Sequence, residues 1–354
     1  MQFMDNPHNI YIHVPFCMSK CRYCAFFSHA CANPDWGAYT NKIISEIEHW
    51  ARLLGRVSVP TVFFGGGTPS LMPTRCFEQI ISKIHQCFDV LYGAEITLES
   101  NPGTIDETRM REFQSFGVNR ISIGVQSFSD EKLKYLGRRH SALDAIKTIQ
   151  TAQKLGLRVS GDFIYGLPDE TVSDVIHTCA QINDLDLQHC SMYELTIEPD
   201  TPIGRENPTM PTNDEMADMY NAIGDTLKLP QYEVSNYATP DKHCQHNENI
   251  WDGAPYIGLG RGAAGRIYHN STWFEQLGDG QLFAPLDAKS RAIEKLITGL
   301  RTTRGTRLTD DVKGVINMDT VHQMPELIQV QDNRISVTRS GMLVLDDILV
   351  KIAG

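Results

Sequence analysis

Two hydrophobic periods alternate along the first two thirds of this chain. Short runs rich in β-branched and aromatic residues, typical of buried strands, are each followed by a stretch in which apolar residues recur every three or four positions, as on one face of a helix. Strands are predicted over residues 10–14, 59–64, 94–99, 119–124, 158–164 and 190–195. Helices are predicted over residues 35–54, 75–88, 104–116, 142–152 and 170–182, with a sixth beginning at residue 212. The pattern therefore predicts six strand–helix units.

Two of these helices carry a sequence signature for their first turn. A threonine followed three residues later by a glutamate is typical of a capping box, in which the two side chains satisfy backbone N–H groups that the first turn leaves free. Thr104 with Glu107 and Thr212 with Glu215 fit this pattern. We therefore expect the third and the sixth helix to begin at these threonines.

Serial strand–helix units favour an α/β fold with a parallel sheet, and six of them predict an open, partial (β/α)6 barrel. Unusual residues follow the predicted strands: a cysteine loop after the first, residues 65–70 after the second, Glu99 at the end of the third, Gln126 after the fourth and Asp162 late in the fifth. Active sites of parallel barrels collect at the carboxyl ends of the strands. These features are therefore expected to meet at one mouth.

The chain divides into three predicted regions. Residues 1–235 form the partial barrel, residues 236–284 a connecting segment, and residues 285–354 a smaller, mainly helical C-terminal domain. Within the last region the apolar pattern predicts a helix over 288–300, a short strand over 334–337 and a closing helix over 340–352.

Three cysteines stand close together in the loop after the first predicted strand. Cys17, Cys21 and Cys24 have the spacing CxxxCxxC, and Phe26 stands at the position where a fourth cysteine would complete the set. Three thiolates can hold an iron–sulfur cube with one iron left open to an outside molecule, whereas an electron-transfer cluster or a structural zinc normally closes with a fourth protein ligand. The triplet thus indicates a cluster at which chemistry can take place.

Zinc binding and disulfide bonds are two other uses of the cysteines. A zinc ion would need His13, His29 or Cys31 as its fourth ligand, but structural zinc sites usually come as two closely spaced pairs, and no second pair lies nearby. Disulfides are disfavoured because nine cysteines is an odd number and the rest are scattered. Most of the others are expected to be buried, since free cysteine packs as a small apolar residue; they are Cys31, Cys76, Cys87, Cys179, Cys190 and Cys244.

Composition narrows the classes of partner. The chain has 354 residues, of which 41% are hydrophobic and 21% charged, as expected for a globular protein with a large core. A net charge of −11 argues against a nucleic-acid partner, because such binding depends on lysine and arginine that neutralise phosphates. No apolar run approaches the roughly 18 residues of a membrane-spanning helix, so membrane contact is expected to be peripheral at most. The absence of a signal peptide predicts a cytoplasmic protein.

Several polar and glycine-rich features have two interpretations each. Residues 65–70 (GGGTPS) expose backbone groups that could hold an amino acid, although a tight strand-to-helix turn explains a glycine run equally well. Glu99 could bind a cation or a ribose, or it could be a solvated strand end. Arg138 offers a fork suited to a carboxylate, or it could be a surface charge at a helix end. Gln126 and Asp162 are ambiguous on their own.

Taken together, these features resemble the radical S-adenosylmethionine (SAM) proteins and, among them, the HemW family. The resemblance is carried by residues 11–17 (YIHVPFC), 24–26, 65–70, 99–103, 117–128 (GVNRISIGVQSF), 193–199 and 244–247. It spans roughly residues 8–270 and is most specific in the first half. The related oxygen-independent coproporphyrinogen III oxidases carry one more cysteine two residues after the triplet, at the position of Phe26.

The resemblance implies a 4Fe-4S cluster held by Cys17, Cys21 and Cys24, with the amino and carboxylate groups of SAM on the fourth iron. It also implies that SAM is contacted by Tyr11, Tyr23, Gly66, Gly67, Thr68, Glu99, Gln126, Arg138 and Asp162. The implied function is that of a heme chaperone, which binds heme and delivers it to recipient heme proteins. The alternatives are an oxygen-independent coproporphyrinogen III oxidase, acting by radical SAM oxidative decarboxylation, and a protein whose cluster only stabilises the fold.

The implied heme site lies in the second half, at residues 246–251 (HNENIW). Members of the HemW family carry HNxxYW there, and a histidine nitrogen is a standard axial ligand of heme iron, which makes His246 the candidate ligand. This chain departs from the family pattern in having Ile250 in place of tyrosine and Ala264 where relatives usually carry histidine. Alternative ligands are His243, Cys244 and His269.

Overall fold

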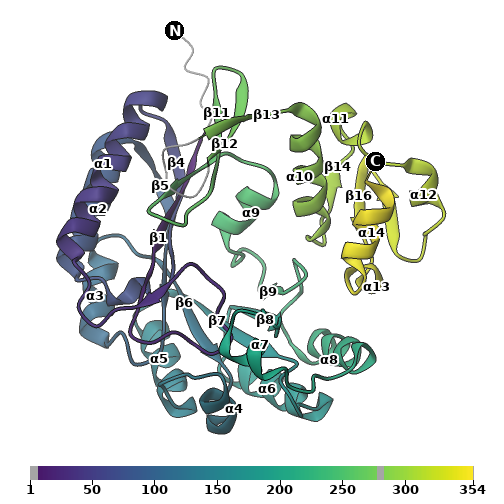
Figure 1. Ribbon diagram of the computed structural model, residues 1–354, viewed down its shortest axis with the longest axis horizontal. Coiled ribbons are helices and arrows are strands. Elements are labelled where there is room, and N and C mark those ends of the chain that lie inside the picture. The colour runs from purple at the N-terminus through teal and green to yellow at the C-terminus, as the bar shows by residue number, and fades with distance from the viewer. Residues whose placement is uncertain (1–6, 277–282, 354) are drawn as a thin grey trace.

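The chain folds around one curved sheet whose parallel strands form the wall of an open barrel (Figure 1). The structure, a computed structural model, describes residues 7–276 and 283–353. Six parallel strands follow one another in the sheet: β1 (Asn9–Val14), β4 (Ser58–Gly66), β5 (Asp89–Ser100), β6 (Arg120–Gln126), β7 (Arg158–Tyr165) and β8 (His189–Glu194). The predicted partial α/β barrel is confirmed.

One long helix lies between or after each of these strands, and together they cover the outer face of the sheet (Figure 1). These helices are α1 (Trp36–Leu54), α2 (Thr74–Cys87), α3 (Glu107–Ser115), α5 (Ala142–Lys154), α6 (Val172–Asp184) and α8 (Asn213–Thr226). Shorter helical turns are η1 (Pro69–Leu71), α4 (Asp130–Tyr135) and α7 (Pro202–Glu206). All six predicted helices are present.

The strands separate an apolar outer face from a polar inner face because successive side chains point to opposite sides. In β1, Ile10, Ile12 and Val14 are fully buried in the core between sheet and helices, whereas Tyr11 lines a cavity on the barrel side. The largest fully buried side chains of this core include Trp50, Phe64, Phe77, Phe88 and Phe113. Packing on the outer face thus leaves the inner face free to carry a site.

The two predicted capping boxes have different outcomes. Thr212 and Glu215 form the expected box at the start of α8. The prediction for α3 is wrong, because Asp106 is the cap and its carboxylate accepts the N–H of Arg109 at 2.8 Å. The Thr104 hydroxyl is instead bonded to the Asn101 carbonyl at 2.6 Å. A local turn therefore competes successfully for the threonine.

Strands after residue 235 extend the sheet at both edges. β9 (Asn236–Ala238) pairs antiparallel with β8, and β10 (Tyr256–Leu259) pairs parallel with β1. Beyond β10 lie three antiparallel strands, β11 (Gly265–His269), β12 (Thr272–Gln276) and β13 (Phe283–Leu286). The helix α9 (Gln245–Trp251) lies inside the opening between the two edges (Figure 1).

The C-terminal residues form a smaller unit with its own apolar core. It contains α10 (Ala288–Leu300), α11 (Asp310–Lys313), α12 (Met318–His322), α13 (Arg339–Met342) and α14 (Leu345–Ile352), and the antiparallel strands β14 (Thr306–Arg307), β15 (Ile328–Gln331) and β16 (Arg334–Val337). The predicted helix over 340–352 is two helices, because Val344 leaves helical geometry at φ −128° and ψ 30°. None of the helices in the described ranges combines the length and apolarity that a membrane span requires.

Two short strands near the N-terminus belong to neither of these sheets. β2 (Phe16–Cys17) and β3 (His29–Ala30) pair with each other in parallel and so bring together the two ends of the loop that carries the cysteines. This loop follows β1 and therefore lies at the carboxyl ends of the parallel strands.

Candidate functional site

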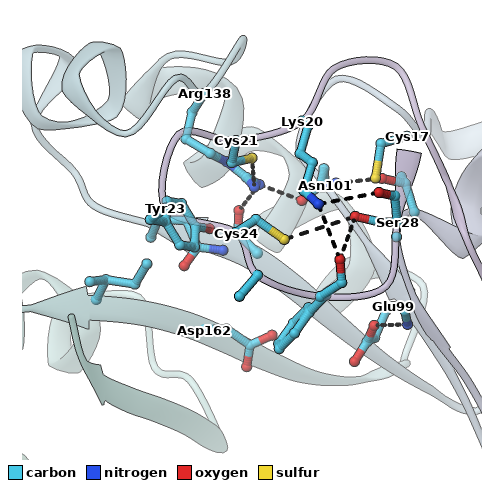
Figure 2. A pocket seen from close by; sticks show the side chains of 18 of the residues that line it. Cys17, Lys20, Cys21, Tyr23, Cys24, Ser28, Glu99, Asn101, Arg138 and Asp162 are labelled. Carbon is cyan, nitrogen blue, oxygen red and sulfur yellow. Dashed lines mark hydrogen bonds between the residues drawn. The ribbon is translucent and has the colours of Figure 1, made fainter. Parts of the chain in front are cut away.

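A cavity of about 480 Å³, here called the outer cavity, opens at the carboxyl ends of the parallel strands beside the cysteine loop (Figure 2). The structure brings eleven of the thirteen predicted site residues to its wall: Cys17, Cys21, Tyr23, Cys24, Gly66, Gly67, Thr68, Glu99, Gln126, Arg138 and Asp162. The remaining two, Tyr11 and His246, lie on a second cavity farther inside the barrel. Side chains far apart in sequence thus meet as the barrel geometry requires.

Hydrogen bonds within the cysteine loop hold its shape. Lys20 donates from Nζ to the carbonyl oxygens of Phe26 and Ser28, at 3.3 Å each (Figure 2). At the base of the loop the N–H of Cys31 donates to the carbonyl of Cys17 at 2.9 Å. The loop is therefore closed on itself before any ligand arrives, which limits the entropy that binding would cost.

The three cysteine side chains have different surroundings. Cys17 is buried, and this burial raises the pKa of its thiol, with a smaller opposing effect from the Thr68 hydroxyl. Cys21 accepts a hydrogen bond at Sγ from Arg138, at 3.3 Å. Cys24 is less enclosed, and all nine cysteines of the chain are free thiols. The triplet is therefore available to an exogenous group.

Arg138 joins the cysteine loop to the barrel. Besides Cys21 it contacts two acceptors, the carbonyl of Gly124 on β6 at 2.7 Å and the side-chain oxygen of Asn101, the residue after β5. Asn101 in turn donates to the Thr68 hydroxyl at 3.0 Å. The interpretation of Arg138 as a surface charge is wrong, since its side chain lies among these groups in the cavity wall. Asn101 was missed because a polar residue in an Asn-Pro-Gly string reads as an ordinary turn.

The glycine run lets the backbone approach the cysteine loop closely. Gly66 has φ +113°, and a side chain there would also meet the ring of His13 at 2.7 Å. A Cβ on Gly67 would lie 2.8 Å from the carbonyl oxygen of Phe16 and 2.9 Å from Cys17 Sγ. Only glycine fits these two positions, so the run is required by the site as well as by the turn.

Two carboxyl groups face the loop from the strands (Figure 2). Burial and, to a smaller extent, the nearby Asp162 raise the pKa of Glu99 to about 8. Its Oε2 accepts the N–H of Gly66 at 2.9 Å. Burial also raises the pKa of Asp162, although its oxygens accept hydrogen bonds from Ser122 at 2.8 Å and Ser160 at 3.2 Å. Carboxyl groups in such surroundings favour a ligand that carries positive charge.

Gln126 ends β6 in an unusual conformation. Its φ is +67°, in the left-handed region that non-glycine residues rarely adopt, and the register with β7 shifts between Gly124 and Gln126. Backbone strain of this kind clusters at ligand sites. The strained turn directs the end of β6 to the outer cavity, which Gln126 lines.

The second cavity, here called the inner cavity, measures about 380 Å³ and lies toward the amino ends of the strands. It shares four wall residues with the outer cavity, Glu99, Ser122, Asp162 and Tyr193. Both volumes fall within the range of about 300–1,000 Å³ that is typical of small-molecule sites. His246, on α9, forms part of the inner wall, and Ile250 and Ala264 line the same cavity.

A chain of hydrogen bonds fixes the protonation of the His246 ring. Asn9 donates from Nδ2 to the Pro255 carbonyl at 3.1 Å, so its oxygen must face Thr61, as the bond from Asn249 to the same oxygen also requires. Thr61 donates its hydroxyl proton to that oxygen at 2.8 Å. The Thr61 oxygen therefore accepts from His246 Nδ1–H, at 2.7 Å. Nε2 of His246 is thus the unprotonated nitrogen with a free lone pair.

This Nε2 is buried and unsatisfied. His246 is 2% exposed, and its Nε2 has no hydrogen-bond partner within the described part of the chain. Burial lowers the pKa of the ring to about 4, which keeps it neutral near pH 7. The backbone is anchored by Glu95, whose carboxylate accepts the N–H groups of Gln245 and His246 at 3.1 and 3.0 Å. A neutral imidazole with a fixed tautomer and a free Nε2 is a suitable metal ligand.

The alternative ligands are occupied or lie elsewhere. The ring of His243 stacks on Tyr232 with 4.0 Å between centroids, and Cys244 is buried with its Sγ 3.6 Å from a Glu95 oxygen. His269, on β11, lines neither cavity. Of the residues considered for zinc, His13 has both ring nitrogens bonded, to the Tyr11 hydroxyl and the Phe27 carbonyl. Of these candidates, His246 is the one that combines a buried nitrogen without a partner and a place on a cavity wall.

The donor set of the outer cavity suits a cluster better than a single ion. Within residues 7–276 and 283–353, no three His, Cys, Asp or Glu side chains converge on one point as ligands of one ion do. Three thiols spread around one cavity match a cluster instead, because each cysteine binds a different iron. The adjoining backbone groups and the Glu99 carboxyl suit a polar organic cofactor beside it.

Comparisons with known proteins agree with this site. The family model described as "Radical SAM superfamily" matches residues 11–182. The chain is 40% identical over 266 residues to "Heme chaperone HemW" of Escherichia coli (strain K12), covering 74% of this chain and 70% of that protein. It is 32% identical over 333 residues to the protein of the same name from Synechocystis sp. (strain ATCC 27184 / PCC 6803 / Kazusa), covering 84% and 79%.

A solved structure confirms the fold. Coproporphyrinogen III oxidase (HemN) from Escherichia coli superposes with a TM-score of 0.81 over 98% of this chain and 90% of that chain, at 20% sequence identity. The barrel, the cysteine loop and the matched region define a radical SAM protein. Within that class the identities of 40% and 32% decide the family: the chain belongs to the HemW family.

Proposed function

We propose that this protein is a heme chaperone, which binds a 4Fe-4S cluster, SAM and heme and delivers heme to recipient heme proteins. The proposal is supported by the 40% identity with the heme chaperone of Escherichia coli. The structural observation that carries it is the buried, unpartnered Nε2 of His246 on the wall of the inner cavity.

Cys17, Cys21 and Cys24 are proposed to hold the cluster. In the radical SAM class the cluster supplies single electrons to the bound cofactor, while the protein positions and shields that cofactor. Gly66, Gly67 and Thr68 would present backbone and hydroxyl groups to it, and the remaining contacts are proposed for Tyr11, Tyr23, Glu99, Gln126, Arg138 and Asp162. Arg138 would also orient the loop, through Cys21.

His246 is proposed as the axial ligand of heme iron. Its ring is neutral, its tautomer leaves Nε2 free, and it packs on Phe63 with 5.0 Å between ring centroids. Ile250 and Ala264, the two departures from the family pattern, line the same cavity. Smaller side chains at these positions leave more space beside the proposed ligand.

The oxidase alternative is disfavoured at one position. Phe26 occupies the place of the additional cysteine of the coproporphyrinogen oxidases, is 68% exposed and lines the outer cavity. A phenylalanine provides no ligand atom or thiol there. The structural likeness to the oxidase concerns the fold alone, so it does not restore the activity.

A pair of histidine variants tests the proposal. His246→Ala should weaken heme binding at least about tenfold in a titration followed in the Soret band, because a buried axial ligand is lost. The matched control His243→Ala removes a neighbouring histidine whose ring stacks on Tyr232, and it should bind heme as the parent does. Both variants should retain the broad cluster absorption after anaerobic reconstitution. Equal heme affinity of parent and His246→Ala would contradict the assignment.

A further inference from the structure

The inner cavity contains a buried arginine side chain that forms no hydrogen bond and no close ion pair among the described residues. Arg120 is the first residue of β6, is 3% exposed and lines this cavity. Its side chain forms no hydrogen bond and no ion pair with any residue in the described ranges. An arginine is charged at every physiological pH. Glu95 and Asp162 compensate this buried charge through space, but they leave its N–H donors without an acceptor.

The neighbouring strand β7 carries an arginine that does form an ion pair. Arg158 stands beside Arg120 in the register of β6 and β7. It donates to Glu95 at 3.0 Å, and this carboxylate also accepts the backbone N–H groups of Gln245 and His246. Glu95 is therefore fully used by Arg158 and α9, and it acts on Arg120 only through space.

The other carboxyl groups of the cavity are also engaged. Asp162 accepts hydrogen bonds from Ser122 and Ser160, and Glu99 accepts the N–H of Gly66. Neither forms an ion pair with Arg120. The guanidinium therefore keeps five donors that no group in the described part of the chain accepts.

A second unpartnered group faces the same space. Nε2 of His246 lacks a partner, as described above, and its lone pair suits a metal ion. Glu99 and Asp162 lie on the wall shared with the outer cavity, and the free N–H donors of Arg120 are the groups of the inner cavity that suit an oxyanion. The planar fork of an arginine matches a carboxylate in particular, because two parallel N–H groups can bind its two oxygens.

We propose that Arg120 is the counter-ion for a carboxylate of a ligand that enters the inner cavity. This inference rests on the proposed function, which gives the protein two ligands with carboxylates. Heme has two propionates, and SAM has one methionyl carboxylate. Heme is the favoured source, because the proposed iron ligand His246 lines the same cavity.

The test compares Arg120→Met with the parent protein after anaerobic cluster reconstitution. Three probes are titrated: heme, the dimethyl ester of heme, and SAM. Loss of a charge-assisted, bidentate contact should weaken the binding of heme about tenfold or more and leave the ester, which lacks the charge, unchanged. Arg111→Met removes a positive charge from the exposed face of α3 and serves as the charge-matched control with parental affinities.

Stability provides an independent readout. Because Arg120 forms no hydrogen bond or close ion pair, Arg120→Met should unfold nearer to the temperature of the parent than Arg158→Met, which removes the close ion-pair partner of the buried Glu95. Arg120→Lys keeps the charge without the fork and should keep the fold while losing part of the affinity. A strong drop in the unfolding temperature of Arg120→Met would mean that the arginine maintains the fold, and would overturn the proposal.

The outcomes separate this inference from the proposed function. Weaker heme binding with unchanged ester binding supports a propionate, and weaker SAM binding with unchanged heme binding supports the methionyl carboxylate. If the parent binds heme and SAM and Arg120→Met binds both equally well, the inference fails and the proposed function stands. If the parent binds no heme, the proposed function fails, and the SAM titration alone decides: weaker binding supports a carboxylate site, unchanged binding overturns it.

Discussion

At the residue scale, the protonation of two buried side chains, His246 and Glu99, determines what the site can bind. His246 is a ligand candidate because the bonds of Asn9 and Thr61 leave its Nε2 with the lone pair. Glu99 is mostly protonated near pH 7 because burial raises its pKa to about 8. Neither property can be read from the residue type, since each depends on neighbours that are distant in sequence.

Thr61→Val tests the tautomer argument. The variant removes the acceptor of His246 Nδ1–H, so the proton is free to occupy Nε2 and heme affinity should fall several-fold with His246 still present. Thr97→Val is a matched control on the next strand, because the buried Thr97 hydroxyl has no hydrogen-bond partner among the described residues. Soret titrations of both variants measure the effect. Parental heme affinity in Thr61→Val would show that the tautomer does not matter.

Glu99→Gln tests the buried carboxyl group. The unfolded chain releases this proton near pH 4.5 and the folded chain near pH 8, so between these values the folded state binds more protons and loses about 1.4 kcal/mol of stability per pH unit from this group. The variant lacks this contribution, and its stability should therefore fall less than that of the parent from pH 5.5 to pH 7.5. Denaturant unfolding at several pH values measures the slopes. Parallel slopes would contradict the raised pKa.

At the scale of elements, the carboxyl ends of the strands and the loop after β1 form the site together. The strands and helices of the barrel follow from hydrophobic periodicity, and so does the convergence of the cysteine loop, the glycine run and Glu99. The cap of α3 does not, because Asp106 and Thr104 are both good caps and only the turn at Asn101 decides between them. The division of the chain near residues 235 and 284 stays a prediction.

The residues around the inner cavity could not be placed from the sequence, because their positions depend on contacts with distant residues. Helix α9 is seven residues long and carries no strong periodicity, and its position depends on backbone bonds to Glu95, about 150 residues earlier. Arg120 is part of a string that supports the resemblance, yet its lack of a hydrogen-bonded partner becomes visible only when the surrounding strands are in place. Long-range pairing of polar groups is the information that a local pattern lacks.

Gly67→Ala tests the contact between the glycine run and the cysteine loop. The added Cβ would lie 2.9 Å from Cys17 Sγ and 2.8 Å from the Phe16 carbonyl, so the loop must shift and the iron content after anaerobic reconstitution should fall clearly below that of the parent. Gly37→Ala is the control, because its Cβ would meet only a side-chain oxygen of Asp35, at 3.4 Å, inside a helix. Four irons per chain in Gly67→Ala would argue against a cluster at this loop.

At the scale of the whole molecule, two adjoining cavities divide the barrel. The outer cavity, with the cysteine loop and Arg138, suits the cluster and SAM, and the inner cavity, with His246 and Arg120, suits a ligand that presents a metal and a carboxylate. The two cavities share a wall, through which their ligands would interact; it is formed by Glu99, Ser122, Asp162 and Tyr193. Heme chaperone activity is the proposal that uses both cavities.

The most direct test is an anaerobic titration of the reconstituted protein with heme, followed in the Soret band, with coproporphyrinogen turnover assayed on the same sample. We expect saturable heme binding without turnover, because His246 offers a free nitrogen and Phe26 replaces the additional cysteine of the oxidases. Turnover of coproporphyrinogen without a stable heme complex would contradict it and would assign the protein to the oxidases.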